Sequence, residues 1–139
     1  MATSINEVMT HDPRTVSADS TLTDAARFMR DDDLGALVVE REGSIAGIVT
    51  DRDIVVGAIA DGRDPSSTRV ADVATDTVVT VTPDQSVEDV RRLMREHDVR
   101  RIVVEQGGRA AGIVALGDLA VDGDAEAELT DISAASPNN

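Results

Sequence analysis

The chain has 139 residues and a formal net charge of −14, with 27 acidic and 13 basic side chains. It contains no apolar run of about 18 residues that would span a membrane, and its N-terminus lacks a secretory pattern. The absence of cysteine excludes disulfides and cysteine-ligated zinc. The acidic balance disfavours binding to the phosphates of nucleic acids. We therefore expect a cytoplasmic protein with one ordinary domain, or two small halves sharing a core.

The charged residues are of unusually few kinds. Every basic residue is arginine, Asp outnumbers Glu by 19 to 8, and Phe28 is the only aromatic residue. At molar salt the electrostatic screening length falls to about 3 Å, so an acidic surface repels itself less. This composition favours a protein from a halophile that accumulates salt. An acidic protein from an ordinary GC-rich bacterium is the alternative, and neither interpretation says much about activity.

The chain is a tandem repeat with an offset of 65 residues. Residues 8–55 align without a gap on residues 73–120, and 19 of these 48 positions are identical. Two copies of this length favour a pair related by a pseudo-twofold axis over an extended array. We expect repeat 1 over residues 4–60, a polar linker over 61–68, repeat 2 over 69–121 and a disordered acidic tail over 122–139.

The first copy has the pattern of a β-α-β-β-α unit. A helix is predicted after Ser20 or Thr21, which are plausible N-caps, because the apolar residues that follow recur at helical spacing. A second helix is predicted to begin near Asp51. Short apolar runs and the turn residues between the last two of them predict strands at residues 14–17, 36–40 and 45–49.

The second copy repeats this order. Ser86 is the expected N-cap of its first helix, and Leu116 stands near the start of its second. The glycine pair at 107–108 predicts a hairpin turn. The corresponding strands are predicted at residues 79–82, 101–105 and 110–114.

Both copies close with related motifs, GIVTDRD at residues 47–53 and GIVALGD at residues 112–118. With Met9-Thr10 and the run VRRIVVE at 99–105, they make the chain resemble a tandem pair of CBS (cystathionine-β-synthase) domains over about residues 4–121. The resemblance implies an α+β fold in which the two β-α-β-β-α repeats pack about a pseudo-twofold axis. It also implies clefts between the repeats that bind adenosine compounds, and a homodimer.

The resemblance assigns Asp53 to the hydroxyls of a ribose and Thr50 to a phosphate. Both assignments suit the chemistry, since a carboxylate accepts from a diol and a threonine hydroxyl donates to a phosphate oxygen. A helix N-terminus at this turn also presents N–H groups to an anion. The alternative is structural: Thr50 or Asp51 caps the helix, and Asp53 lies in its first turn.

The resemblance also implies which residues of the second copy complete this cleft. Backbone groups of Val79 and Thr80 are expected to contact the adenine edge, and the Ile102 side chain its face. Arg100 and Arg101 stand where related proteins place basic residues against phosphates, which suits the bidentate guanidinium. Strand alternation places them on opposite faces, so one of them is expected to face the ligand. A surface arginine paired with an acid is the alternative for either.

The second cleft retains Asp118 and the strand with Thr15 and Val16, but Ala115 replaces the hydroxyl residue. Its partner segment has Gly35 and Ala36 in place of two arginines. This cleft therefore keeps an acceptor for ribose and lacks donors for phosphate. We expect it to be empty or to bind an uncharged nucleoside portion.

No residue pattern in the chain indicates an enzyme. Acidic and serine residues occur without an accompanying nucleophile, base and oxyanion donor set. His11 and His97 have no neighbouring ligand residues, so no metal site is expected. The leading hypothesis is a regulatory module that binds AMP or ATP, without a further cofactor, and signals to an unknown effector protein. The alternative is a structural or dimerisation module whose clefts remain empty.

Overall fold

The structure is a computed structural model that describes residues 3–76 and 79–119. The chain divides into two compact units, one of residues 13–77 and the other of residues 1–12 together with 78–139. We call them the repeat-1 unit and the repeat-2 unit, and describe each by itself. The tail expected to be disordered, residues 122–139, lies outside the described residues.

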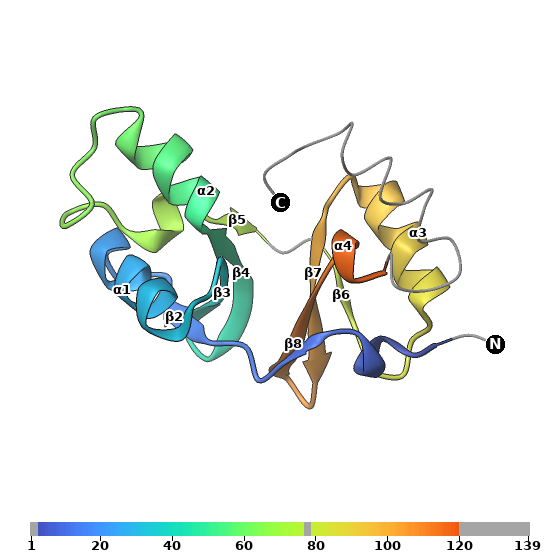
Figure 1. The fold of residues 1–139 in the computed structure, drawn as a ribbon. Coiled ribbons are helices and arrows are strands. Elements are labelled where there is room, and N and C mark those ends of the chain that lie inside the picture. The colour runs from blue at the N-terminus through green and yellow to red at the C-terminus, as the bar shows by residue number, and fades with distance from the viewer. Residues whose placement is uncertain (1–2, 77–78, 120–139) are drawn as a thin grey trace. The chain divides into compact units, whose positions relative to one another are not determined.

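The repeat-1 unit contains a four-stranded sheet in the order β2-β3-β4-β5. β2 pairs in parallel with β3, whereas the β3–β4 and β4–β5 pairs are antiparallel. Figure 1 shows this sheet beside its helices. Its elements are β2 (Thr15–Ser17), α1 (Leu22–Asp32), β3 (Ala36–Arg41), β4 (Ser44–Thr50), α2 (Asp51–Ile54), the wide-turned π-helical segment η2 (Val55–Ile59), the short 3-10 helix η3 (Val70–Asp72) and β5 (Thr75–Asp76).

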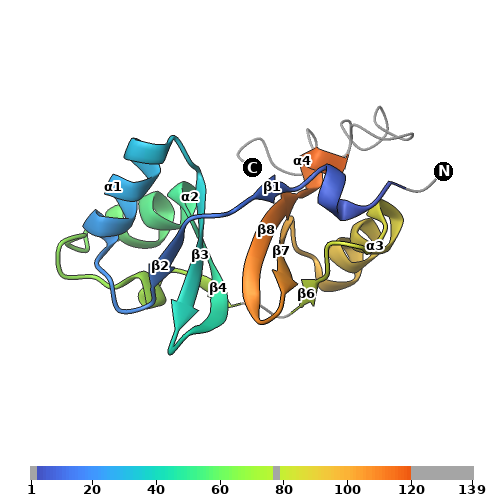
Figure 2. The same cartoon turned by 90° about the horizontal axis from the view of Figure 1, so that it is seen from below.

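The repeat-2 unit has the matching sheet, in the order β1-β8-β7-β6. β6 pairs in parallel with β7, and the β7–β8 and β8–β1 pairs are antiparallel. In Figure 2 the ribbon of β1 lies along β8. The elements are η1 (Ile5–Glu7), β1 (Thr10–His11), β6 (Thr80–Val81), α3 (Val87–His97), β7 (Arg101–Gln106), β8 (Arg109–Ala115) and α4 (Leu116–Leu119). The α+β class predicted from the sequence is confirmed.

Each unit is completed by a segment that the predicted repeat bounds assign to the other repeat. Residues 5–11 form η1 and β1 of the repeat-2 unit, although they lie within the stretch 4–60 predicted as repeat 1. The equivalent residues 70–76, within the stretch 69–121 predicted as repeat 2, form η3 and β5 of the repeat-1 unit. The buried residue of each short helix, Ile5 or Val70, enters the core of the unit it completes. A spatial unit is therefore not one continuous stretch of the chain.

The N-caps of the two long helices agree with the sequence prediction. The Thr21 hydroxyl accepts a hydrogen bond from the Asp24 backbone N–H at 3.2 Å, and Ser86 accepts from Asp89 at 3.1 Å. These bonds satisfy N–H groups that have no partner within the helix. Each helix ends at an aspartate in the left-handed conformation, Asp33 with φ 56° and Asp98 with φ 53°. Aspartate tolerates this conformation better than most non-glycine residues.

The two cores are aliphatic, as the composition predicts. In the repeat-1 unit, Leu22, Ala25 and Met29 of α1 pack against the inner residues of the sheet, among them Leu37 and Val49. In the repeat-2 unit, α3 packs in the same way against Ile102, Val104 and Val114. Phe28 packs at the edge of the first core, with the Arg14 guanidinium 4.1 Å from its ring centroid. Such a contact is a cation–π interaction.

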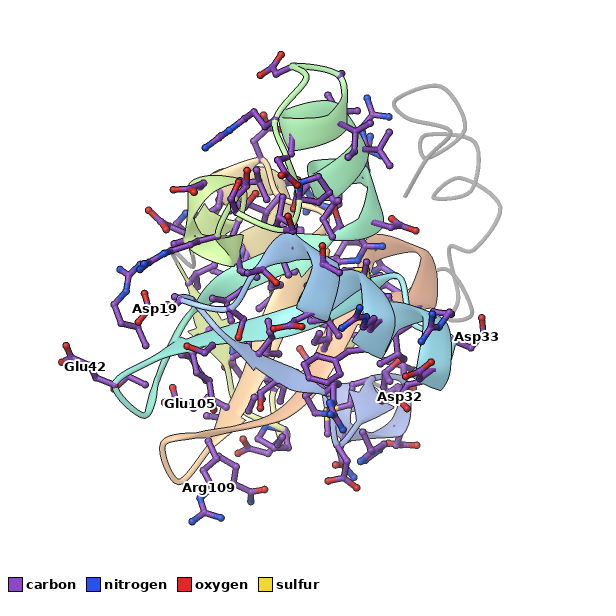
Figure 3. The ribbon with its side chains drawn as sticks, turned by 90° about the vertical axis from the view of Figure 1, so that its left-hand side faces the viewer. Asp19, Asp32, Asp33, Glu42, Glu105 and Arg109 are labelled. Carbon is purple, nitrogen blue, oxygen red and sulfur yellow. The ribbon has the colours of Figure 1, made fainter. Side chains whose placement is uncertain are left out.

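Among residues 3–76 and 79–119, charged side chains lie outside these cores with one exception. The acidic side chains labelled Asp19, Asp33 and Glu42 in Figure 3 point away from the ribbon. Arg91 of α3 is only 4% exposed; it pairs with Glu88, and its Nη2 donates to the Leu119 carbonyl at 3.1 Å. This arginine joins α3 to the end of α4. The aligned residue of repeat 1 is Ala26, so the link belongs to the repeat-2 unit.

The stretch predicted as a linker folds against α1. The backbone N–H groups of Leu22 and Thr23 donate to the carbonyls of Thr68 and Pro65 at 3.0 and 3.2 Å. Thr68 is 5% exposed and its hydroxyl donates to the Asp64 carbonyl. The Asp64 carboxylate accepts from the hydroxyl and the backbone N–H of Ser66 at 2.7 and 2.9 Å. Residues 61–68 are therefore part of the repeat-1 unit.

Two glycines permit the edge strands to approach. A Cβ atom at Gly47 would lie 2.2 Å from the Thr75 carbonyl oxygen of β5. A Cβ at Gly112 would lie 2.8 Å from the Thr10 carbonyl oxygen of β1 and 2.6 Å from the Met9 sulfur. The backbone oxygens cannot retreat without losing their strand pairing. Only glycine fits at these two positions.

We expect Gly47→Ala to destabilise the protein by about 1–3 kcal/mol, because the added methyl group displaces β5. Urea denaturation measures this change. Gly117→Ala is the matched control, because a Cβ at that helical position meets nothing within 4 Å. Alanine is favoured over glycine in a helix by about 1 kcal/mol, so the control should be neutral or stabilising. Equal effects of the two substitutions would contradict the close-approach explanation.

The hydrogen bonds of Asp64 predict a measurable titration. They lower the pKa of Asp64 below its ordinary value, with the hydrogen bond from the Ser66 hydroxyl as the largest cause and that from the Ser66 backbone N–H next. A lowered pKa stabilises the folded state above the unfolded pKa of about 3.9, and this contribution is lost as the pH falls through the folded pKa. Ser66→Ala should raise the pKa of Asp64 in an NMR titration of its carboxyl carbon. Ser67→Ala, which leaves both bonds in place, should not change it.

Candidate functional site

The turn between β4 and α2 contains the two leading candidate residues. Strand β4 ends at Thr50, whose backbone is extended (φ −115°, ψ 163°), and the helix begins at Asp51. The Thr50 hydroxyl accepts from the Asp53 backbone N–H at 3.0 Å. In return, Asp53 Oδ2 accepts from the Thr50 backbone N–H at 2.9 Å. These reciprocal bonds form a capping box, so the predicted N-cap role of Thr50 is confirmed.

The capping box does not use every polar atom of the two side chains. Thr50 uses its hydroxyl oxygen as an acceptor, and its hydroxyl hydrogen takes no part in the box. Asp53 uses Oδ2, and its second carboxylate oxygen takes no part either. Thr50 is 9% exposed and Asp53 is partly buried, so the box holds both groups in fixed positions. The turn therefore contains one donor and one anionic acceptor, three residues apart, that the capping box does not use.

The equivalent turn of the repeat-2 unit holds half of this arrangement. Asp118 Oδ2 accepts from the Ala115 backbone N–H at 2.8 Å, which matches the bond from Thr50 to Asp53. Ala115 has no hydroxyl with which to return a bond. The carboxylate is thus placed alike in both units, whereas the donor exists only in the repeat-1 unit. This difference agrees with the reading of the sequence.

The two candidate arginines lie next to the second turn within their own unit. Arg101 is opposite Ala115 in the β7–β8 pairing, and the Leu116 N–H donates to the Arg100 carbonyl at 2.8 Å. Both arginines are partly buried. The repeat-2 unit therefore gathers Arg100, Arg101 and Asp118 at one end of its sheet. The β7–β8 register implies this grouping, which the spacing of the three residues along the chain does not reveal.

The corresponding positions of the repeat-1 unit carry no charge. Ala36 is opposite Thr50 in the β3–β4 pairing, and the Asp51 N–H donates to the Gly35 carbonyl at 3.0 Å. Thus Thr50 and Asp53 have small neutral residues as neighbours in their own unit. Gly35 and Ala36 therefore do not provide the positive charge that Arg100 and Arg101 provide at the aligned positions of the repeat-2 unit.

Two of the strand candidates have buried side chains. Val16 of β2 is 4% exposed and Ile102 of β7 is 1% exposed, and both belong to the cores of their units. A ligand reaches them only through their backbones. This differs from the expectation that the Ile102 side chain packs on a base.

The remaining strand candidates are partly buried. Thr15 of β2 is opposite Val38, and Thr80 of β6 is opposite Val103. The Thr80 hydroxyl donates to Glu105 Oε1 at 3.2 Å, so it already has an acceptor. Val79 precedes β6 and packs against the core of the repeat-2 unit. Backbone contacts therefore suit these positions better than side-chain contacts.

Neither histidine belongs to a metal-binding cluster within the described part of the chain. His11 Nε2 lies 2.9 Å from the Asn6 carbonyl oxygen. No group of three His, Asp or Glu side chains among residues 3–76 and 79–119 is arranged to hold a metal ion. None of the helices in these ranges has both the length and the apolarity needed to cross a bilayer.

The two α+β units, each with an acid in the helical turn that follows its β-hairpin, define a two-repeat protein. The model of the CBS domain family matches the chain twice, over residues 5–57 and 70–121. The chain belongs to this family and carries two CBS domains. The resemblance seen in the two closing motifs is thereby confirmed.

Known proteins resemble the chain along most of its length. The CBS domain-containing protein YhcV from Bacillus subtilis (strain 168) is 40% identical over 119 residues, which cover 86% of this chain and 84% of that protein. The structure of a hexameric CBS-CP12 protein from bloom-forming cyanobacteria matches with a TM-score of 0.79 at 34% identity, covering 89% of this chain and 74% of that one. The structure of Hypoxic Response Protein I with two coordinated zinc ions matches with a TM-score of 0.72 at 34% identity. The match covers 86% of this chain and 98% of that one.

We expect Thr50→Ala to destabilise the protein by about 1 kcal/mol, because the Asp53 N–H loses its capping acceptor. Thr50→Ser keeps the hydroxyl and is the matched control. Urea denaturation of both variants measures the difference. An alanine variant as stable as the serine variant would contradict a capping role for Thr50.

Proposed function

We propose that this protein is a regulatory module that binds an adenine nucleotide at the turn formed by Thr50 and Asp53. Membership of the CBS domain family supports the class of function. The observation that carries the proposal is the pair of groups that the capping box leaves over, the Thr50 hydroxyl hydrogen and the second oxygen of Asp53. A ribose diol donates to a carboxylate oxygen, and a phosphate accepts from a hydroxyl.

In the repeat-2 unit, the proposal assigns phosphate binding to arginine. Arg100 and Arg101 are the basic residues that the sequence predicts for binding phosphate. A guanidinium binds two phosphate oxygens at once, and it retains its charge at every physiological pH. In a chain of net charge −14, such a pair supplies the local attraction that an anionic ligand needs. AMP and ATP are the proposed ligands, and no further cofactor is required.

In this proposal, nucleotide binding changes the conformation of the module, and another protein responds to that change. Neither the sequence nor the site indicates catalysis, so the module acts by binding and not as an enzyme. A ligand shifts the equilibrium between two conformations of a protein only by the difference in its affinity for those conformations. We further propose that the protein self-associates, a proposal supported by the hexameric assembly recorded for the cyanobacterial CBS-CP12 protein. The effector is a separate and unidentified protein.

A structural module without a ligand is the second candidate function. The capping box favours it, because the box alone gives Thr50 and Asp53 a role in folding. Ala115 favours it as well, since it removes the donor from the second turn. The two candidates differ in one measurable property, the stabilisation of the protein by nucleotides.

Thermal unfolding in molar KCl with AMP, ADP, ATP, S-adenosylmethionine or NADH tests the proposal. A ligand at 100 times its dissociation constant stabilises the folded state by about 2.7 kcal/mol, which raises the melting temperature. We expect AMP or ATP to give such a shift. If none of the five ligands shifts the transition, the binding proposal is wrong and the structural module is favoured.

Substitutions locate the site. Asp53→Ala and Arg101→Ala should each reduce the nucleotide-dependent shift, compared with the same variant without ligand. Asp51→Ala is the matched control, because it removes an equal charge one residue beyond Thr50 and leaves the capping box in place. A full shift in Asp53→Ala would show that the nucleotide binds elsewhere.

A further inference from the structure

Helix α3 contains a buried cation. Arg91 is 4% exposed, and it is the one charged residue among the buried side chains of residues 3–76 and 79–119. It pairs with Glu88, and its Nη2 donates to the Leu119 carbonyl of α4 at 3.1 Å. Removing a guanidinium from water costs free energy that its partners have to offset. The packing of α3 alone does not explain why such a residue stands there.

The matching helix of repeat 1 packs without an arginine at this position. Ala26 of α1 aligns with Arg91, and it is exposed. The buried residues of the two helices otherwise correspond in position: Leu22, Ala25 and Met29 in α1, and Val87, Val90 and Met94 in α3. Replacing a buried ion pair by apolar residues is often neutral or stabilising. Stability alone therefore does not account for the arginine.

Helix α4 begins with a weaker attachment than α2. At the start of α2, Thr50 and Asp53 exchange the two hydrogen bonds of the capping box. At the start of α4, the Ala115 N–H donates to Asp118 Oδ2 at 2.8 Å, and alanine has no hydroxyl with which to complete a box. The repeat-2 unit thus lacks half of the attachment that the repeat-1 unit has. It has instead the bond from Arg91 to the other end of the described helix.

We propose that Arg91 is a positioning residue, which holds α4 in place of the missing half of the capping box and thereby fixes the candidate residues of the repeat-2 unit. Figure 1 shows α4 beside α3. Helix α4 carries Asp118, and the Leu116 N–H at its start donates to the Arg100 carbonyl at 2.8 Å. At Leu119 the carbonyl accepts from the Arg91 guanidinium. The described helix is therefore held at both ends.

The consequence for ligand binding is a fixed placement of a carboxylate beside a cation. Arg100 is one of the two residues to which phosphate binding is assigned, and Asp118 is the carboxylate on the helix that begins at its carbonyl. A site whose groups have to be ordered at the moment of binding loses affinity, so an anchored α4 favours the ligand. This consequence rests on the proposed function, whereas the attachment of α4 by Arg91 does not.

Amide hydrogen exchange of the full chain without nucleotide tests the attachment. Arg91→Met removes the donor and keeps an apolar side chain of similar length. We expect the amides of Ala115 and Leu116 to exchange about tenfold faster, because losing a hydrogen bond from a charged group favours local opening. Arg91→Lys retains a donor and should restore part of the protection. Arg92→Met is the matched control, since Arg92 is exposed and its printed ion pairs lie within α3. Unchanged amides of the repeat-1 unit verify that each variant folds.

A second substitution tests whether Arg91 replaces the missing half of the capping box. Ala115→Thr restores the hydroxyl that repeat 1 has at Thr50, so the helix regains an attachment at its start. The double variant Arg91→Met/Ala115→Thr should therefore recover the slow exchange of the natural protein at Leu116. A double variant no better protected than Arg91→Met contradicts the replacement. Exchange that Arg91→Met leaves unchanged at α4 overturns the positioning role altogether.

Thermal unfolding with AMP measures the consequence for the ligand. Arg91→Met should lose part of the AMP-dependent rise in melting temperature, Arg91→Lys should lose less of it, and Arg92→Met should retain all of it. A full rise in Arg91→Met, in a variant whose α4 amides exchange faster, would show that the anchored helix does not serve the ligand. The absence of any rise in the natural protein is a failure of the proposed function, and the exchange measurements, made without AMP, still decide the role of Arg91.

Discussion

The fold depends on two places where backbone approaches backbone more closely than any side chain permits. Gly47 of β4 and Gly112 of β8 lie under the carbonyl oxygens of Thr75 and Thr10. Because no Cβ intervenes, a short strand from elsewhere in the chain adds to the edge of each sheet. This strand brings with it a 3-10 helix whose apolar residue fills the core. A sheet edge that would otherwise expose unpaired backbone groups is covered in both units.

The two units share this framework and differ in the residues of the candidate site. The strand registers, the N-caps of the two long helices and the carboxylate after the hairpin correspond in both. The differences gather at one end of the sheet, where Thr50 corresponds to Ala115 and Gly35-Ala36 to Arg100-Arg101. The repeat-1 unit thus carries a donor and an acceptor with no arginine at the two positions opposite them, and the repeat-2 unit carries an acceptor beside two arginines.

Much of the fold was predictable because local sequence patterns determine its helices and turns. Helical spacing located α1 and α3, and Thr21 and Ser86 were recognisable as caps. The glycine pair at 107–108 predicted a hairpin, and the repeat itself indicated two similar units. At the candidate site, both the ligand interpretation and the capping interpretation of Thr50 were available from the sequence. The structure confirms the capping bonds, which are local, and leaves the ligand a proposal.

Other features depend on contacts that leave no local signal. A two-residue strand such as β1 has no periodicity, so its pairing with β8 could not be read from residues 10 and 11. The polar segment 61–68 resembled a linker because its attachment to α1 uses backbone hydrogen bonds, which composition does not reveal. Arg91 resembled a surface residue of an amphipathic helix, and its burial depends on the carbonyl at the end of α4. The position of Arg101 beside Ala115 needed only the hairpin register and was accessible in principle.

The central claim is that the turn with Thr50 and Asp53 binds an adenine nucleotide. An NMR titration of the ¹⁵N-labelled protein with AMP in molar KCl tests it most directly, because backbone amides report contacts residue by residue. The account predicts the largest chemical-shift changes at the amides of Thr50 and Asp53, with saturation at one nucleotide per chain. Unchanged amide signals at this turn, with or without changes at Ala115 and Asp118, would contradict it.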